Sequence, residues 1–438
     1  MPKMQHFGWF FSRGFGPQGW GRDYQRWNYD WTSPGLYQQS AQALEQAGIE
    51  LVIVEDALSL GNPSTLDLRV REAYGGPKLD PLLLAPYLFA ATSRIGITPT
   101  INPIATPPYT AARQVASLAH LSDQRFGINV VTDVGSSRHF GQQPISHDAA
   151  YDRASEWTDV LRKLWHSWGD GALIADPVSG RFADGELMDA FEHSGAYYDV
   201  AGPLNALPLP TDPVVVSPGS SPRGIEYAGT HSDVQLAAAP LTVESIRAYR
   251  AKVHDAALLQ GRKPDDIRIL FVFQPEVVAS ADDADRIVAA SATPSDDVLR
   301  KVAAAQSSDL ETDLTTLDLD RPLDPAVFAD HVSQGSIKRL LGRFDSFADA
   351  PLRDILAAKA RKGRISDGTG FVGTPDEVAD FVELLGDEAD NDGFILNGDL
   401  HPVGVHAQLG QLVPTLRRRG LLRDHLSDGG LRENLFDF

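Results

Sequence analysis

The chain has 438 residues, 42% of which are apolar, and its formal net charge is −20. A chain of this length can bury a large core, whereas its acidity disfavours nucleic acids and anionic membrane surfaces as partners. The lack of cysteine excludes disulfides and cysteine-based catalysis or metal binding. The first residues lack the basic and apolar segments of a signal peptide, and no apolar run reaches the length of a membrane span. The sequence therefore predicts a soluble, cytoplasmic protein.

Eight short apolar runs alternate with amphipathic helical patterns along the chain. Most of these runs are continuous rather than alternating, which is typical of strands that are buried on both faces. The predicted strands are 6–11, 51–54, 95–98, 127–131, 214–216, 234–237, 267–273 and 393–396.

Amphipathic helices are predicted between these strands. The first ends at Gly48, because glycine is favoured just beyond a helix C-terminus. Another begins at Thr374, where Pro375 and Glu377 occupy the first and third helical positions. The predicted helices are 36–47, 81–91, 110–120, 148–168, 222–229, 242–259, a helix from 375 onward, and 405–418.

Eight strands alternating with helices favour an α/β fold of the (β/α)8 TIM barrel type over a doubly wound sheet. We expect residues 1–438 to form a single barrel domain. Long insertions are expected after strands 4 and 7, at about 135–212 and 275–372. In such barrels, insertions lie in the loops that surround the active site. The acidic stretch 307–325 is predicted to be a surface loop next to helices.

Polar groups concentrate in the segment 125–151. Asn129 lies near the end of a predicted strand, a loop with Arg138 and His139 follows, and His147 and Tyr151 begin a helix. Because they are four residues apart, His147 and Tyr151 share one helix face and could transfer protons or bind phosphate. A strand, a solvated loop and a helix cap without function would give the same pattern.

The segment 214–224, VVVSPGSSPRG, predicts a strand followed by a helix start. Ser221 is placed as the N-cap, with Pro222 as the first helical residue. The free N–H groups of such a helix end attract anions, and Ser220, Ser221 and Arg223 could add donors or charge. At the mouth of a barrel, this arrangement would suit a phosphate. A plain helix cap is the alternative.

Polar side chains also follow the second and third predicted strands. Asp56 comes directly after the second strand, and Thr100 and Asn102 follow the third. These positions face the barrel mouth, where the side chains could bind a ligand or hold a neighbouring loop. The two roles cannot be separated from the residues alone.

Aromatic residues are dense near the N-terminus. Trp20, Trp27 and Trp31 lie in a loop-like segment and could line an apolar pocket, although packing against the barrel rim is the simpler interpretation. Common hydrolase, nucleotide-binding and zinc motifs are missing from the sequence, so no metal site is predicted.

Several other segments carry a family pattern in order along nearly the whole chain. They are LVIVED (51–56), IGITPTINPIATPPYTAAR (95–113), LAHLSDQRFGINVVT (118–132), HDAAYDRA (147–154), LWHSW (164–168), YDVAGP (198–203), PGSS (218–221), GTPDEVAD (373–380) and DGFIL (392–396). Together they resemble the flavin-dependent monooxygenases of the bacterial luciferase-like superfamily. More narrowly, the chain is similar to the nitrilotriacetate, dibenzothiophene sulfone and pristinamycin synthase type.

The resemblance implies a TIM barrel that binds FMN non-covalently at its C-terminal face. The catalytic candidates that it implies are His147 and Asn129. Two positions depart from the family pattern: Asn102-Pro103 replaces a common Ser-Thr pair, and Ile128 replaces the usual Trp. The implied FMN-binding residues are Asp56, Thr100, Asn102, Asn129, His147, Tyr151, Ser220 and Ser221.

The function implied by the resemblance is oxygenation of a small, apolar or aromatic substrate by reduced FMN and O2, through a C4a-(hydro)peroxyflavin. A separate NAD(P)H:flavin reductase would supply the reduced FMN, and the chain would form a homodimer or homotetramer. Three alternatives stay open: an F420-dependent oxidoreductase of the same superfamily, a non-catalytic flavin-binding protein, and an unrelated barrel hydrolase acting on a phosphorylated substrate.

Overall fold

The computed structural model describes residues 2–11, 30, 32–61, 63, 65–72, 77–328, 334–398 and 402–438. The predicted aromatic pocket residues Trp20, Trp27 and Trp31 lie outside these described residues. None of the helices in the described ranges is both long and apolar enough to cross a membrane.

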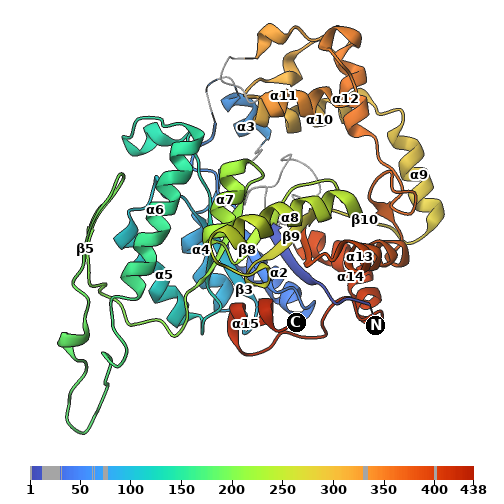
Figure 1. The fold of residues 1–438 in the computed structure, drawn as a ribbon. Coiled ribbons are helices and arrows are strands. Elements are labelled where there is room, and N and C mark those ends of the chain that lie inside the picture. Colours follow the sequence, from blue (N-terminus) through green and yellow to red (C-terminus); the bar gives the residue numbers. More distant parts are fainter. Residues whose placement is uncertain are drawn as a thin grey trace.

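Eight parallel strands close into a barrel in the order β1-β12-β9-β8-β7-β4-β3-β2 (Figure 1). Each predicted strand is one of these eight, so the predicted (β/α)8 barrel is confirmed. Three strands run two or three residues further than predicted at their C-terminal ends. The bounds are β1 His6–Phe11, β2 Leu51–Val54, β3 Gly96–Ile101, β4 Gly127–Val130, β7 Val214–Pro218, β8 Val234–Ala237, β9 Arg268–Phe273 and β12 Gly393–Gly398.

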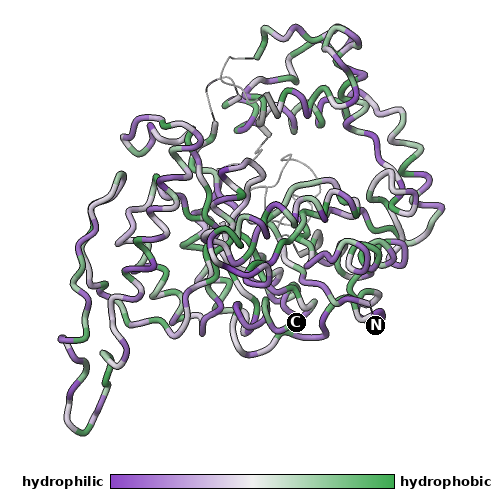
Figure 2. Tube along the Cα trace, viewed as in Figure 1, coloured by the Kyte–Doolittle hydropathy of each residue, from purple (hydrophilic) through white to green (hydrophobic). Residues whose placement is uncertain are grey.

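The strands are continuously apolar because both of their faces are buried. In β2, Leu51 and Ile53 join the core inside the barrel, whereas Val52 and Val54 join the core between the barrel and its helices. Figure 2 shows hydrophobic residues along the central strands, while hydrophilic residues recur on the surrounding helices. Helix α15 (Gly430–Phe436) closes the N-terminal end of the barrel, where Leu431 packs over Gly96 and Gly127.

The predicted helices are present around the barrel. Gly48 has a positive φ of 80° just beyond the first of them, and Thr374 forms the predicted capping box with Glu377. The helices that follow the barrel strands are α2 Gly35–Gln46, α4 Pro81–Phe89, α5 Pro108–Leu121, α6 His147–Trp165, α7 Pro222–His231, α8 Val243–Leu259, α13 Pro375–Ala389 and α14 Pro402–Arg418.

The segment after β4 contains more than an insertion. It holds the short 3-10 helix η1 (Ser137–Phe140), then the barrel helix α6, and then the hairpin of β5 (Glu192–Ser194) and β6 (Asp199–Ala201). The chain of this hairpin extends away from the barrel in Figure 1.

The segment after β9 builds a helical lobe. It begins with β10 (Glu276–Val277), which pairs with β11 (Val372–Gly373). Between them lie α9 (Ala281–Ser291), α10 (Asp296–Leu310), α11 (Gln334–Leu341) and α12 (Leu352–Ala360). Helices α10 to α12 share a hydrophobic core that is separate from the barrel cores.

The prediction of a surface loop at 307–325 is wrong for its apolar residues. Leu310, Leu314, Leu319 and Leu323 are buried in the core of the helical lobe. The leucines recur among aspartates at irregular intervals, so neither a helical nor a strand period revealed their common buried side.

Candidate functional site

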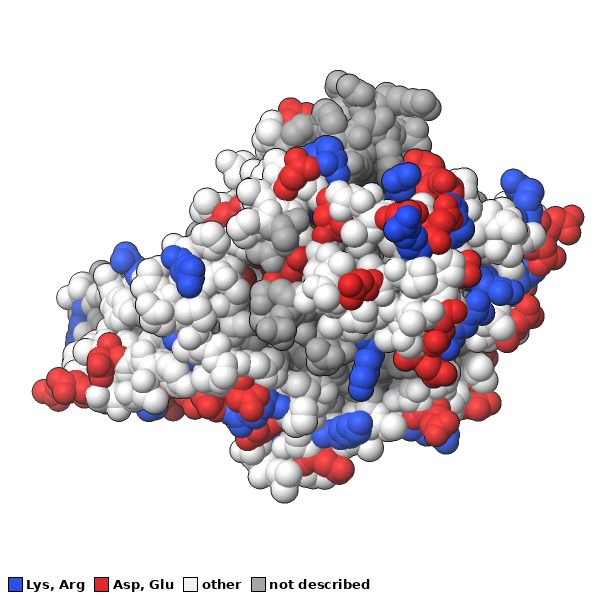
Figure 3. Space-filling view, turned by 90° about the horizontal axis from the view of Figure 1, so that it is seen from above, with Lys and Arg blue, Asp and Glu red and all other residues white. Residues whose placement is uncertain are grey.

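Most of the predicted site residues lie at or just beyond the C-terminal ends of β2, β3, β4 and β7, which are neighbours in the barrel, whereas His147 and Tyr151 lie on α6. The strand register aligns them: Thr100 on β3 pairs with Asn129 on β4, and Asn129 pairs with Val216 on β7. This end of the barrel lies opposite the one that α15 closes. Figure 3 shows this face from above, with acidic and basic side chains interspersed rather than gathered into one large patch.

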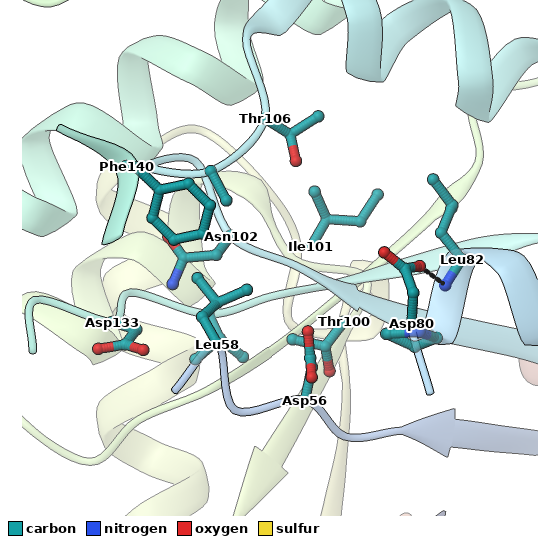
Figure 4. A pocket seen from close by; sticks show the side chains of 13 residues that line it. Asp56, Leu58, Asp80, Leu82, Thr100, Ile101, Asn102, Thr106, Asp133 and Phe140 are labelled. Carbon is teal, nitrogen blue, oxygen red and sulfur yellow. Dashed lines mark hydrogen bonds between the residues drawn. The ribbon is translucent and has the colours of Figure 1, made fainter. Parts of the chain in front are cut away.

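A cavity of about 300 Å³ opens at the ends of β2 and β3. Three of the predicted residues line it, namely Asp56, Thr100 and Asn102. Figure 4 shows these side chains around the cavity together with Asp80 and Phe140, which the sequence did not single out. Thr100 and Asn102 are buried, and this cavity gives their polar groups access to a ligand.

Asn129 lies deeper in the barrel and is only 1% exposed. Its Nδ2 donates a hydrogen bond of 2.8 Å to the Thr100 hydroxyl, while its Oδ1 is buried without a hydrogen-bond partner in the described part of the chain. A buried acceptor that is left unpaired is uncommon and costs about 1–3 kcal/mol. The Oδ1 atom is therefore a natural acceptor for a ligand N–H or hydroxyl group.

Asn102 has a local role as well. Its Oδ1 accepts a hydrogen bond of 2.9 Å from the backbone N–H of Ile104 and fixes the turn after β3. This turn occurs where the sequence departs from the family pattern. The amide nitrogen of Asn102 remains available to the cavity.

The turn between β7 and α7 has the strand end and Ser221-capped helix start that the sequence predicted; anion binding there stays a prediction. Ser221 caps α7, and its hydroxyl accepts a hydrogen bond of 3.1 Å from the Gly224 N–H. The serine hydroxyl can still donate outward, next to the free N–H groups of the helix end. Ser220 is exposed beside it. Arg223 forms ion pairs with Asp152 and Glu226, so two carboxylates already neutralise its charge.

Two residues that the sequence reasoning missed hold this turn in place. The Gly219 carbonyl accepts hydrogen bonds from Gln235 Nε2 at 2.8 Å and from the Tyr249 hydroxyl at 3.0 Å. Gln235 also donates to Tyr249, at 3.0 Å. A glutamine inside the apolar strand β8 was the available sequence signal, since buried polar groups need partners.

Tyr151 packs against the same turn. A Cβ atom added to Gly219 would lie 2.7 Å from the Tyr151 hydroxyl, so glycine is needed for this approach. Burial raises the pKa of Tyr151, and hydrogen bonding to Thr132 and Ser221 opposes the rise only in part. The phenol therefore stays protonated at neutral pH and can donate a hydrogen bond to an anion.

His147 lies at the outer edge of this group. Its Nε2 is 3.5 Å from the Ser221 hydroxyl, and its ring meets the Tyr151 ring edge-on at 5.1 Å. Its Nδ1 is 2.9 Å from the Asp148 carboxylate, and its side chain is 57% exposed. The structure thus brings His147, Tyr151 and Ser221 together, whereas Arg138 and His139 are exposed on η1.

Asp56 has an unusual proton affinity. Its pKa is raised from 3.8 to about 6, mainly by burial. The charge of Lys78 opposes this rise, and the neighbouring carboxylates of Glu55 and Asp80 add to it. The Lys78 ammonium is itself paired with Glu55. Above pH 6 the folded protein must therefore carry a poorly compensated charge at this cavity.

We expect Asp56→Asn to stabilise the protein above about pH 6, by roughly 1–2 kcal/mol after discounting for solvent screening. Because the pKa of Asp56 is raised in the folded state, the cost of its ionisation is complete above the folded value and vanishes below the unfolded one. The gain should therefore disappear near pH 4. Urea unfolding of both proteins at pH 7.5 and pH 4 measures this difference. A gain that is equal at both pH values would contradict it, and Asp424→Asn, at a carboxylate that is 82% exposed, is the control.

Comparison with known proteins places this arrangement in a family. A family model described as luciferase-like monooxygenase matches residues 6–387. N-acetyl-S-(2-succino)cysteine monooxygenase of Bacillus subtilis (strain 168) is 30% identical over 407 residues, covering 91% of this chain and 88% of that protein. Nitrilotriacetate monooxygenase component A of Aminobacter aminovorans is 30% identical over 437 residues, covering 95% and 94%.

A solved structure also resembles this chain over its whole length. The crystal structure of a riboflavin lyase with a modified FMN and riboflavin superposes with a TM-score of 0.80 at 27% identity, covering 100% of this chain and 96% of that one. The family match spans most of the chain, including the turn at Ser221, the helix start at His147 and seven of the eight barrel strands. The chain therefore belongs to the luciferase-like monooxygenase family and is, as its motifs predicted, a flavin-dependent monooxygenase.

Proposed function

We propose that this protein uses reduced FMN and O2 to oxygenate a small organic substrate. The observation that carries the proposal is the continuous group of polar residues at the ends of four neighbouring strands. It has a helix N-terminus for a phosphate at one end and the unpaired Asn129 acceptor further inside. A phosphorylated flavin carries a group for each end of this site: a phosphate anion for the helix N-terminus and ring N–H groups for the Asn129 acceptor.

The phosphate end is supported by the local donors. The Ser221 hydroxyl, the neutral Tyr151 phenol and the first N–H groups of α7 can all donate to phosphate oxygens. The positive end of the helix dipole adds to the attraction. Ser220 lies next to these donors. The missing side chain of Gly219 leaves the backbone of the turn open to close approach.

The ring end is supported by buried polar atoms. Asn129 Oδ1 has no partner among the described residues, and Asp56, Thr100 and Asn102 line the adjoining cavity. These groups offer acceptors and donors to the edge of a flavin ring or to the hydroxyls of its side chain. A buried site with an unpaired acceptor fits FMN better than it fits an apolar ligand alone.

When bound, reduced FMN supplies the activation of O2, and the protein supplies binding, orientation and shelter from water. We propose Asn129 as the residue that holds the reacting part of the cofactor, through its unpaired Oδ1. The family resemblance implies a catalytic role for His147, such as managing a proton there. Its position beside Ser221 favours a contact with the phosphate instead.

The substrate is proposed to be small and largely apolar or aromatic. Leu58, Ile101 and Phe140 belong to the apolar part of the cavity at the barrel mouth. Carboxylates at the same cavity, Asp56 and Asp80, would bind polar groups of the substrate.

A separate NAD(P)H:flavin reductase is the proposed source of reduced FMN. The relative from Aminobacter aminovorans is named as one component of its monooxygenase, which supports a second component here. The chain also lacks the glycine-rich fingerprint of a dinucleotide-binding fold. A homodimer or homotetramer is proposed as the working assembly.

The purified protein with FMN and NADH should oxidise no NADH by itself. With an added flavin reductase, a screen of small apolar and aromatic compounds under 18O2 should yield a product containing one 18O atom. That product should require the protein, FMN and the reductase together. Steady NADH consumption without a reductase would contradict the two-component proposal, and turnover with reduced F420 in place of FMN would favour the hydride-transfer alternative.

A further inference from the structure

A second cavity, of about 680 Å³, opens on the other side of the barrel mouth. It lies between the chain that follows β9, the β10–β11 ladder and α14. None of the four strands of the candidate flavin site contributes to its wall. Figure 1 shows β10 and α14 on the side of the barrel away from α5 and α6.

This cavity contains hydrogen-bond donors that have no partner within the described ranges. Gln408 Nε2, on α14, is covered from solvent and has no hydrogen-bond partner among the residues that the structure describes. Arg361 lines the same cavity and forms no ion pair with any residue that the structure describes. Lys362, by contrast, is paired with Glu276. Unpaired positive charge and a buried free amide are notable on a chain with a net charge of −20.

An aromatic ring forms another part of the wall. Phe371 is 41% exposed, and its ring packs edge-on against Phe273 at 5.8 Å. The β10–β11 ladder fixes this wall, because the Glu276 N–H donates to the Phe371 carbonyl at 2.9 Å. The backbones of Gly363 and Gly370 touch behind it, where a Cβ on Gly370 would lie 2.4 Å from the Gly363 nitrogen. The cavity is thus preformed rather than loose.

We propose that this cavity binds an organic carboxylate with a planar apolar body. The ring of such an acid would pack against Phe371, and its carboxylate would accept hydrogen bonds from Gln408 and Arg361. Guanidinium groups suit carboxylates because two parallel N–H donors match the two oxygens. The ligand class is therefore that of aromatic acids, at a site additional to the candidate flavin site.

Benzoate is the probe, measured by ligand-observed NMR titration of the full-length protein. Wild-type protein should bind it saturably, and Arg361→Gln and Gln408→Leu should each weaken binding by about tenfold or more. Arg300→Gln, which removes an exposed charge from α10, should leave the affinity unchanged. Benzyl alcohol, which lacks the carboxylate, and inorganic phosphate, which lacks the ring, should both bind about tenfold more weakly than benzoate.

Equal benzoate affinity in the wild type and in both cavity variants would overturn the proposal. Phosphate binding as tight as that of benzoate would overturn the assignment to an organic acid. Ser221→Ala should bind benzoate normally, so failure of this inference and failure of the FMN proposal can be told apart.

Discussion

Gly219→Ala is expected to weaken the binding of reduced FMN by about 10–100-fold, which corresponds to roughly 1–3 kcal/mol of strain and lost contact. Gly219 has a φ of 133°, a conformation that side chains rarely adopt, and the new Cβ would lie 2.7 Å from the Tyr151 hydroxyl. The turn cannot move away easily, because Gln235 and Tyr249 both bind its carbonyl. Anaerobic fluorescence titration measures the affinity.

Gly180→Ala is the matched control for Gly219→Ala. Gly180 also has a positive φ, of 71°, but nothing lies within 4 Å of an added Cβ, and it is outside the site. This variant also places alanine at a positive φ but without the collision, so FMN binding should be unchanged. If folded Gly219→Ala protein bound FMN with wild-type affinity, the turn would not be part of the phosphate site.

His147→Ala is expected to weaken the binding of reduced FMN by about 10-fold or more, since a hydrogen bond to a charged group contributes about 1.5–3 kcal/mol. The reason is its position: Nε2 is 3.5 Å from the Ser221 hydroxyl at the helix start. Saturating FMN should then restore the rate at which bound reduced FMN is reoxidised by O2. Flavin absorbance after rapid mixing with O2 measures this rate.

The alternative role of His147 gives a different result. If its imidazole transfers a proton in the reaction, turnover should stay about 10²–10⁴-fold low even at saturating FMN. Hydrogen peroxide released per FMN oxidised should rise as well. His139→Ala, an exposed histidine on the neighbouring η1, is the control and should leave both quantities unchanged.

The barrel could be predicted because its strands are buried on both faces. Continuous apolar runs such as 51–54 are typical of parallel strands when helical patterns separate them. The C-terminal ends of the strands were predicted less accurately. Thr100 and Ile101 extend β3 because they pair with Asn129 and Val130, and this pairing cannot be read from local sequence.

The candidate site was predictable where it follows from position on a strand. Asp56, Thr100 and Asn102 were expected at the barrel mouth, and they line one cavity there. Gln235 and Tyr249 were missed, because their role depends on contact with a turn that is distant in sequence.

The surroundings of His147 could not be predicted from the sequence either. Its neighbour Ser221 lies 74 residues away in the chain, so the pairing depends on how α6 and α7 pack. The half-exposed position of its ring could not be predicted from a helix start alone.

The most direct test of the FMN proposal is an anaerobic titration of the wild-type protein with reduced FMN, reduced riboflavin and reduced F420. We expect FMN to bind at least about tenfold more tightly than riboflavin, because only FMN carries the phosphate for Ser221, Tyr151 and the α7 N-terminus. We also expect FMN to bind more tightly than F420. Equal affinities for FMN and riboflavin, or a preference for F420, would contradict the proposal.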